Sequence, residues 1–336
     1  YLSFRMLFMS ILKHICELAN YHKKEQSVYL CGRFSTLRLF YPDELNKPSY
    51  SDFHSNGNIK DYCSDGDSGN TKECKTDFDK IKAVCLWLFE QLFVKNNNSN
   101  INTLEYIMIW LSYMLTLKKV KNINNLKGFY EAYIRNNTHY TNCNTGGKDC
   151  SNLLKDNTGY TNYKEIIDTK KDLLNINIEN MSKFYDAFKL LCSIHTDFNE
   201  HKPNCTGYIE KSNEFVSKYT NLNDDSNNID GSSYRKVLCT LSNDYDNFKK
   251  KCNSVNCMDI PSLPPIKKIQ VSVNSPEQTL QDSGVTSSNP SILSKLIPVL
   301  SIIVAIPIFF GIFYKYSLFE FRKRPQKQHL REKLKK

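Results

Sequence analysis

An uncharged apolar run near the C-terminus limits what this chain can fold into more than any other feature. The run is LIPVLSIIVAIPIFFGIFY, residues 296–314, and it lies between Lys295 and Lys315. As a helix it would extend roughly 28 Å, close to the roughly 30 Å of a bilayer's hydrocarbon core. Pro298 and Pro307 would disrupt a soluble helix, whereas a membrane span tolerates them. The run therefore predicts a single C-terminal transmembrane helix, with a buried core helix as the alternative.

The residues that follow the predicted span are strongly basic. Residues 315–336 contain nine Lys or Arg and two Glu, so they carry +7 of the chain's formal net charge of +10. The positive-inside rule places this tail in the cytoplasm and the preceding residues across the membrane. We expect the bilayer to be its partner and expect no nucleic-acid partner, because the rest of the chain is nearly balanced in charge. The membrane-flanking basic residues are Lys295, Lys315, Arg322, Lys323 and Arg324.

All twelve cysteines precede the apolar run, and Cys257 is the last of them. A reduced cytosolic protein has no reason to confine its cysteines to one side of a membrane span, whereas an oxidised outer domain does. We expect most cysteines between positions 31 and 257 to form intradomain disulfides, with the connectivity open. Closure of Cys143 with Cys150 is geometrically easy across NTGGKD. The candidate disulfide cysteines are Cys31, Cys63, Cys74, Cys85, Cys143, Cys150, Cys192, Cys205, Cys239, Cys252 and Cys257.

Between positions 31 and 260, apolar residues recur at the spacing of amphipathic helices. One stripe covers residues 78–92 and follows Thr76, a plausible N-cap. Residues 104–117 are apolar nearly all round but too short to cross a membrane, as expected of a central core helix. No alternating run with hairpin turns competes, so the predicted fold class is all-α. Further helices are expected around 126–134, 163–174, 181–198, 208–219 and 234–248, with Trp110 and Phe188 buried.

Composition predicts how the rest of the chain is organised. Residues 261–295 hold five of the eleven prolines and no cysteine, which favours an extended, largely disordered stalk after a helical domain at 31–260. Residues 1–30 are of uncertain status: MLFMSIL resembles the apolar part of a signal peptide, but no small-residue cleavage site follows. Polar segments such as 63–74 and 136–150 separate the helices and suit recognition loops.

Motifs that would carry chemistry are weak. Cys192, His195, His201 and Cys205 are residue types that bind zinc. His195, however, lies on an apolar helical stripe, and each cysteine has ten other possible partners. No nucleophile, phosphate-loop or metalloprotease motif occurs. We therefore expect no enzyme, no catalytic residue, no metal or other cofactor, and no small-molecule substrate.

The same segments resemble the Plasmodium interspersed repeat (PIR) family, the variant proteins of malaria parasites. Family proteins usually begin shortly before the residue matching Cys31, which suggests that residues 1–30 are misread upstream sequence. The resemblance itself extends from Cys31 to the C-terminus. It rests on CGRFSTLRLFYPDEL, CLWLFEQLF, EYIMIWLSYMLTLK, FYDAFKLLC, YRKVLCTLSNDYDNFKKKC and KLIPVLSIIVAIPIFFGIFYKYSLFEFRKRPQKQHLREKLKK, the last being similar to the anchor of the rodent-parasite branch.

This resemblance implies an α-helical, cysteine-containing outer domain, a stalk, one membrane span and a short basic tail, with no catalytic residues to carry over. It further implies a variant antigen exported to the infected host cell or its surface. Immune evasion or adhesion, through an unknown host protein or immune receptor, is the expected role. The alternative is an intracellular trafficking or membrane-remodelling protein, which free rather than bridged cysteines would favour.

Overall fold

A computed structural model of the chain describes residues 26–45, 47, 53–63 and 73–267, all within the unit Tyr1–Ser272. Helices dominate these residues, and a helix forms in every region where the apolar periodicity predicts one. The described residues also contain one two-stranded hairpin, which the periodicity does not predict. The all-α prediction is confirmed, with the hairpin as a local addition.

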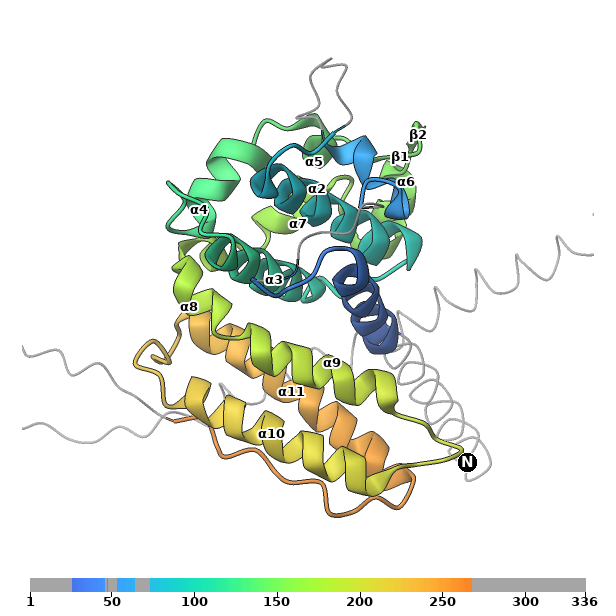
Figure 1. Cartoon of the computed structure of the whole chain (residues 1–336), viewed down its shortest axis with the longest axis vertical. Coiled ribbons are helices and arrows are strands. Elements are labelled where there is room, and N and C mark those ends of the chain that lie inside the picture. Colours follow the sequence, from blue (N-terminus) through green and yellow to red (C-terminus); the bar gives the residue numbers. More distant parts are fainter. Residues whose placement is uncertain (1–25, 46, 48–52, 64–72, 268–336) are drawn as a thin grey trace, which may run out of the picture. The chain divides into compact units, whose positions relative to one another are not determined.

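The upper group of helices in Figure 1 has α3, Thr103–Leu117, along its lower side, next to the lower group. Helix α2, Asp77–Phe89, packs against α3 and continues through a wide helical turn, Glu90–Lys95. Shorter elements surround this pair. They are the 3-10 turns Asn56–Tyr62 and Lys171–Asn175, α4 Leu126–Phe129 with the wide turn Tyr130–Ile134, α5 Thr138–Thr141, α6 Ser151–Thr158, α7 Tyr163–Asp168 and α8 Ile178–Ser182.

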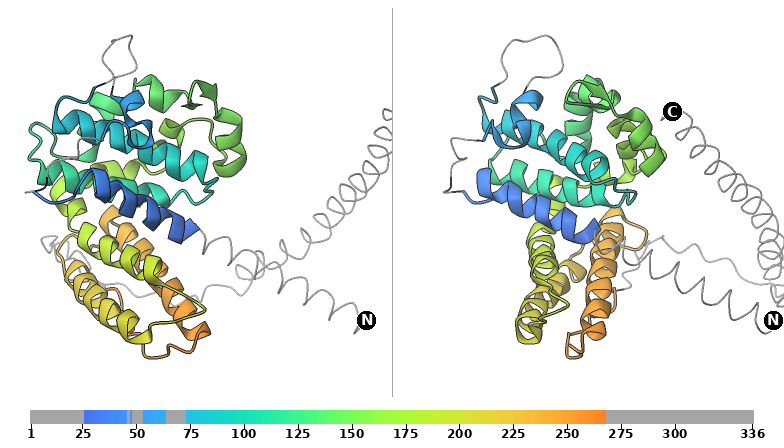
Figure 2. Two further views of the ribbon diagram at one scale, coloured as in Figure 1. Left: turned by 45° about the vertical axis from the view of Figure 1, so that its right-hand side comes forward. Right: turned by 90° about the vertical axis from the view of Figure 1, so that its right-hand side faces the viewer.

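The lower group consists of three long helices that run side by side (Figures 1 and 2). They are α9 Tyr185–Asp197, α10 Cys205–Asn223 and α11 Ser233–Ser254, and each of the three contacts the other two. We call this group the three-helix base. A further helix over residues 26–40 precedes the upper group in the sequence and contacts α9 through its side chains.

Side-chain caps begin several of these helices where the sequence supplies a cap. The Thr76 hydroxyl accepts the Asp79 backbone N–H, and the Asp79 carboxylate accepts the Thr76 N–H in return, which completes a capping box. Ser232 accepts the backbone N–H of Arg235 at 3.2 Å at the start of α11. The predicted N-cap at Thr76 is therefore confirmed.

The core centres on α3 and on the face of α9 that it meets. Trp110 and Phe188 are each 1% exposed, which confirms that both are buried. The Phe188 ring stacks on Tyr106 of α3 at 4.6 Å between centroids and meets the edge of Phe34 at 4.8 Å. Phe188 thus joins α9 to α3 and to the helix over 26–40.

The structure differs from both predicted boundaries of the helical domain. The helix over 26–40 crosses the boundary at residue 30, and Leu30 is buried in the core. At the other end, residues 261–267 are extended but lie against α10 and α11 instead of starting a disordered stalk. Asn223 donates to the Pro265 carbonyl at 2.9 Å, and Tyr245 donates to the Pro261 carbonyl at 2.8 Å. Proline removes donors but leaves these carbonyls to accept, so a proline-rich segment is held by side chains.

Among the described residues, every helix is too short or too polar to cross a membrane. The predicted span at 296–314 lies outside those residues, as do 268–295 of the predicted stalk and the basic tail at 315–336. Lys295, Lys315, Arg322, Lys323 and Arg324 lie there as well.

Candidate interaction surface

Two of the disulfides join elements that are far apart in the sequence. Cys31, on the helix over 26–40, bonds to Cys192 of α9 across 161 residues. Cys205, the first residue of α10, bonds to Cys257 across 52 residues, just after α11 ends. The Cys31–Cys192 bond fixes the three-helix base to the helix over 26–40. The Cys205–Cys257 bond joins the start of α10 to the segment after α11, within the base.

Two other disulfides close short polar loops. Cys63 and Cys74 are separated by 11 residues, and Cys143 and Cys150 by 7. The bond between Cys143 and Cys150 is the one for which the short spacing in the sequence predicts easy closure, and the structure contains it. Figure 1 shows α5, β1 and β2 at the end of the domain opposite to α10 and α11.

A polar cavity of about 630 Å³ lies between the end of the 3-10 turn Asn56–Tyr62, which precedes Cys63, and the segment that runs from α5 to the hairpin. Most of its lining residues are exposed and polar, with the Tyr62 and His139 rings packed edge to face at 5.9 Å between centroids. We call its lining the loop surface. It comprises Asp61, Tyr62, Thr138, His139, Asn142, Asn144, Gly146 and Gly147.

The hairpin at the edge of the loop surface depends on two glycines. Strands β1, Asn144–Thr145, and β2, Lys148–Asp149, pair antiparallel around Gly146 and Gly147. These glycines have φ values of +58° and +80°, in the left-handed region that a two-residue hairpin turn of this kind requires. Asp149 then accepts the Ser151 backbone N–H at 2.8 Å, which lowers the pKa of its carboxyl group.

A buried carboxylate lies near the loop surface. Glu90, in the wide turn after α2, is 7% exposed, and its carboxylate lies 3.6 Å from the Lys95 ammonium. Burial raises the pKa of Glu90, and Lys95 opposes that shift. Sequence reasoning did not single out this residue, because one glutamate at the end of an apolar helix has no distinguishing pattern.

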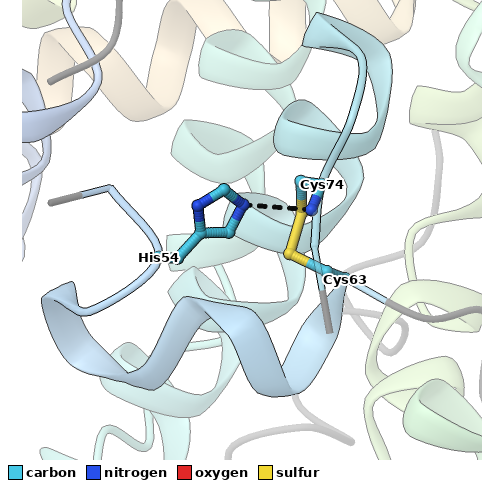
Figure 3. Close-up of side chains that lie close together, drawn as sticks. All are labelled: His54, Cys63 and Cys74. Atoms are coloured by element: carbon cyan, nitrogen blue, oxygen red, sulfur yellow. Dashed lines mark hydrogen bonds between the residues drawn. A yellow bond between two sulfur atoms is a disulfide. The ribbon is translucent and has the colours of Figure 1, made fainter. Parts of the chain in front are cut away.

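The loop closed by Cys63 and Cys74 is held by a histidine (Figure 3). Nε2 of His54 accepts the Cys74 backbone N–H at 3.0 Å. The ligand atoms of His54, Cys63 and Cys74 lie within 4.8 Å of one another, which is a distance compatible with a metal site. In the disulfide the two sulfur atoms are bonded to each other, so these residues could hold a metal only after reduction. The sequence carried no signal for His54.

Three candidate disulfide cysteines are thiols in the described part of the chain: Cys85, Cys239 and Cys252. For these three the disulfide expectation does not hold. Cys85 and Cys252 point into the core from amphipathic helices, and burial raises the pKa of each to about 12. Both therefore stay protonated at neutral pH, which makes them poor nucleophiles and poor metal ligands.

The structure does not bring the zinc-type residue set together. Cys192 and Cys205 belong to different disulfides, so neither offers a thiolate. His195 is buried beside Phe248, with 5.7 Å between ring centroids. Burial lowers the pKa of His195 to about 3, and its imidazole is therefore neutral.

Comparison with known proteins identifies relatives of this chain. The family model described as Plasmodium variant antigen protein Cir/Yir/Bir matches residues 31–315. Among solved structures, the chain is similar to a Plasmodium PIR protein ectodomain, with 29% sequence identity, a TM-score of 0.49, and coverage of 72% of this chain and 99% of that one. No curated protein matches. The chain belongs to the Plasmodium variant antigen family Cir/Yir/Bir, as the resemblance in its sequence indicates.

Proposed function

We propose that this protein is a membrane-anchored variant antigen, exported to the infected host cell, whose loop surface binds a host macromolecule in adhesion or immune evasion. One observation carries the proposal: the end of the 3-10 turn that precedes the Cys63–Cys74 disulfide and the hairpin closed by Cys143–Cys150, which are distant in the sequence, border the same polar cavity. The family consists of variant antigens and is not a known enzyme family.

The chemistry of the loop surface suits recognition by a variable protein. Exposed Asn, Asp and Thr side chains add little to folding, so they can change without loss of the domain. Their amide, carboxylate and hydroxyl groups offer both donors and acceptors to a partner. The disulfides restrain the loop ends, which lowers the entropy lost when a partner binds.

Within the described residues, the loop surface and the last segment of the domain lie at opposite ends. Residues 261–267 run along α10 and α11, and β1, β2 and α5 lie at the other end of the domain (Figure 1). The last described residue, Lys267, therefore lies at the three-helix base, and the predicted span at 296–314 follows it in the sequence.

Protease treatment of intact infected cells tests the display. With an epitope tag after Lys336, trypsin added outside the cells should shorten the tagged chain to a membrane-retained fragment that begins in the stalk. A parasite protein of known internal location serves as the protection control. Full-length protein that persists on intact cells and is cut only after detergent would contradict the proposal and support the intracellular trafficking alternative.

Variants of the loop surface test the binding. Asn142→Ala with Asn144→Ala removes two exposed amides without touching the core, so the variant should be displayed normally. Adhesion of cells displaying it to host endothelial or immune cells should fall severalfold. Lys218→Ala, at an exposed ion pair of the base, is the matched control. Equal adhesion of both variants and the parent protein would exclude the loop surface as the contact.

A further inference from the structure

The connection between α3 and α4 carries an excess of positive charge. Residues 118–127, which we call the lysine loop, contain four lysines and no acidic residue. Of the chain's net charge of +10, the tail at 315–336 carries +7, so +3 remains for all other residues. The lysine loop alone carries +4, so the rest of those residues sum to −1. The four lysines are Lys118, Lys119, Lys121 and Lys127.

The lysine loop is anchored to the core by its apolar residues. Val120 and Ile123 pack against the core, and Leu126 is buried within it. The Ile178 backbone N–H donates to the Asn124 carbonyl at 3.2 Å, which ties the loop to the start of α8. The apolar side chains thus lie inward, and the lysines lie on the outer side. The exposed lysines are Lys119, Lys121 and Lys127.

Helix stability does not account for all four charges. Lys118 and Lys119 follow the C-terminus of α3, where cations interact favourably with the helix dipole. Lys127, by contrast, lies in the first turn of α4, the end at which a cation is unfavourable. Lys121 belongs to neither helix. Among the described residues, none of the four lysines forms an ion pair, so their charges are available to a partner.

Carboxylates on the neighbouring elements do not neutralise the lysine loop. In the 3-10 turn that packs against α4, Asp172 pairs with Lys236. In the wide turn after α4, Glu131 pairs with Arg135. Even when Glu179 of α8 is counted against the lysine loop, a surplus of +3 remains. The carboxylates near the later turns of α3 are paired as well: Asp43 with Lys189, Glu44 with Lys47 and Asp186 with Lys218.

The residue types in the lysine loop indicate which polyanion fits it. The loop has no aromatic side chain and no arginine, on which proteins stack the bases of single-stranded nucleic acids. Its apolar side chains face the core, so none is left to insert into a bilayer, and the anionic leaflet of a membrane is the cytoplasmic one. Asn122 and Asn124 are exposed between the lysines, and their amides can bond to hydroxyl groups.

We propose that the lysine loop binds a sulfated polysaccharide, a linear chain that carries repeated sulfate groups. The ammonium groups meet successive sulfates, and the asparagine amides bond to the sugar hydroxyls. In Figure 1, α4 lies on the left of the upper group and β1 and β2 on its right, so this surface is separate from the loop surface. Access to such a ligand relies on the outward placement in the proposed function, whereas the binding itself does not.

Acetylation of lysines on the folded full-length chain in a neutral detergent tests the surface, with a heparin oligosaccharide as the probe. Mass spectrometry reads each lysine in its own peptide, so the basic tail is scored separately. The probe should slow acetylation of the lysine loop severalfold and leave the exposed controls Lys155, Lys202 and Lys250 unchanged. Four charge contacts should weaken by about a hundredfold between 50 and 200 mM salt, because bound counterions are released.

Three results of this experiment would overturn the proposal. The first is a lysine loop that reacts at the same rate with and without the probe. The second is equal protection by desulfated heparin or by polyglutamate, which would remove the preference for sulfate. The third is protection by phosphatidylserine vesicles but not by heparin, which would make the lysine loop a membrane contact.

Variants on intact cells separate this site from the proposed function. Labelled heparin should bind severalfold less to cells that display the triple variant Lys119→Gln, Lys121→Gln, Lys127→Gln than to cells that display the parent chain. The matched control Lys155→Gln, Lys202→Gln, Lys250→Gln should bind like the parent. Equal binding by the two variants would overturn the assignment to the lysine loop. Protection of the lysine loop in detergent without heparin binding to intact cells would confirm the site and contradict the outward placement.

Discussion

The loop surface and the three-helix base use the same covalent bond for different purposes. The disulfides beside the loop surface span 11 and 7 residues and fix the ends of loops whose sequences are polar. Those of the base span 161 and 52 residues and hold long helices with buried side chains together. Sequence can vary between the ends of a short loop without disturbing the core, whereas a change in the base affects the whole fold. Under the proposed function, the three-helix base is then the permanent framework and the loop surface is the replaceable part that a partner recognises.

Removal of the longest disulfide should weaken the base most. In the double variant Cys31→Ser, Cys192→Ser, the chain-entropy relation predicts a loss of about 5 kcal/mol in the free energy of unfolding. Urea unfolding monitored by circular dichroism measures it. A loss no larger than that from opening the hairpin disulfide would break the distinction between framework and surface.

Truncation of the central ring of the base should cost almost as much. Phe188→Ala leaves a cavity between α9, α3 and the helix over 26–40, and should lower the free energy of unfolding by about 3–5 kcal/mol. Leu39→Ala is the control, because Leu39 is 72% exposed and should cost almost nothing. Comparable losses in the two variants would contradict the placement of Phe188 in the core.

Acid should weaken the base before it affects the loops. The pKa of His195 is about 3 in the folded protein and about 6.5 in the unfolded chain, so below pH 6.5 the unfolded state binds a proton that the folded state does not. Stability contributed by the neutral imidazole is complete above pH 6.5 and falls by about 2 kcal/mol between pH 7 and pH 5.

Comparison of His195→Gln with His201→Gln isolates this effect. His201 is exposed, so its replacement should preserve the pH dependence, and replacement of His195 should flatten it. Hydrogen exchange at pH 5 should show faster opening of α9 and α11 than of the upper helices. If the free energy of unfolding of His195→Gln depends on pH as steeply as that of the parent chain, His195 is not the group responsible for the loss of stability in acid.

Opening of the hairpin disulfide should have the smallest effect on stability. The double variant Cys143→Ser, Cys150→Ser should lose about 2 kcal/mol of unfolding free energy, because only seven residues are closed by the bond. Its binding to host cells should nevertheless fall, since the hairpin edge of the loop surface loses its restraint. Full adhesion together with a large loss of stability would reverse the roles of the two regions.

The helices of both regions could be predicted from the sequence, because burial of one face imposes a period on apolar residues. The stripe at 78–92 and the nearly uniform run at 104–117 contain that information locally. The Thr76 capping box is equally local, since donor and acceptor are three residues apart. Three of the four disulfide pairings could not be predicted: only the tertiary fold brings Cys31 to Cys192 or Cys205 to Cys257.

The polar cavity at the loop surface and the ion pair between Glu105 and Lys170 could be predicted less well than the helices, because both depend on contacts between distant parts of the sequence. Glu105 and Lys170 meet across 65 residues, and neither has a local signal. The segment 261–267 illustrates the opposite error, because its proline content favours a stalk. Its carbonyls nevertheless accept hydrogen bonds from Asn223, Arg235 and Tyr245, and composition cannot reveal such partners.

The redox state of the cysteines in the native membrane tests the central claim most directly. Protein from infected cells is alkylated before lysis, digested without reduction and analysed by mass spectrometry. The account predicts linked peptides for Cys31–Cys192, Cys63–Cys74, Cys143–Cys150 and Cys205–Cys257, with Cys85, Cys239 and Cys252 as thiols. Full alkylation of the eight paired cysteines without reduction would contradict an oxidised outer domain and favour an intracellular role.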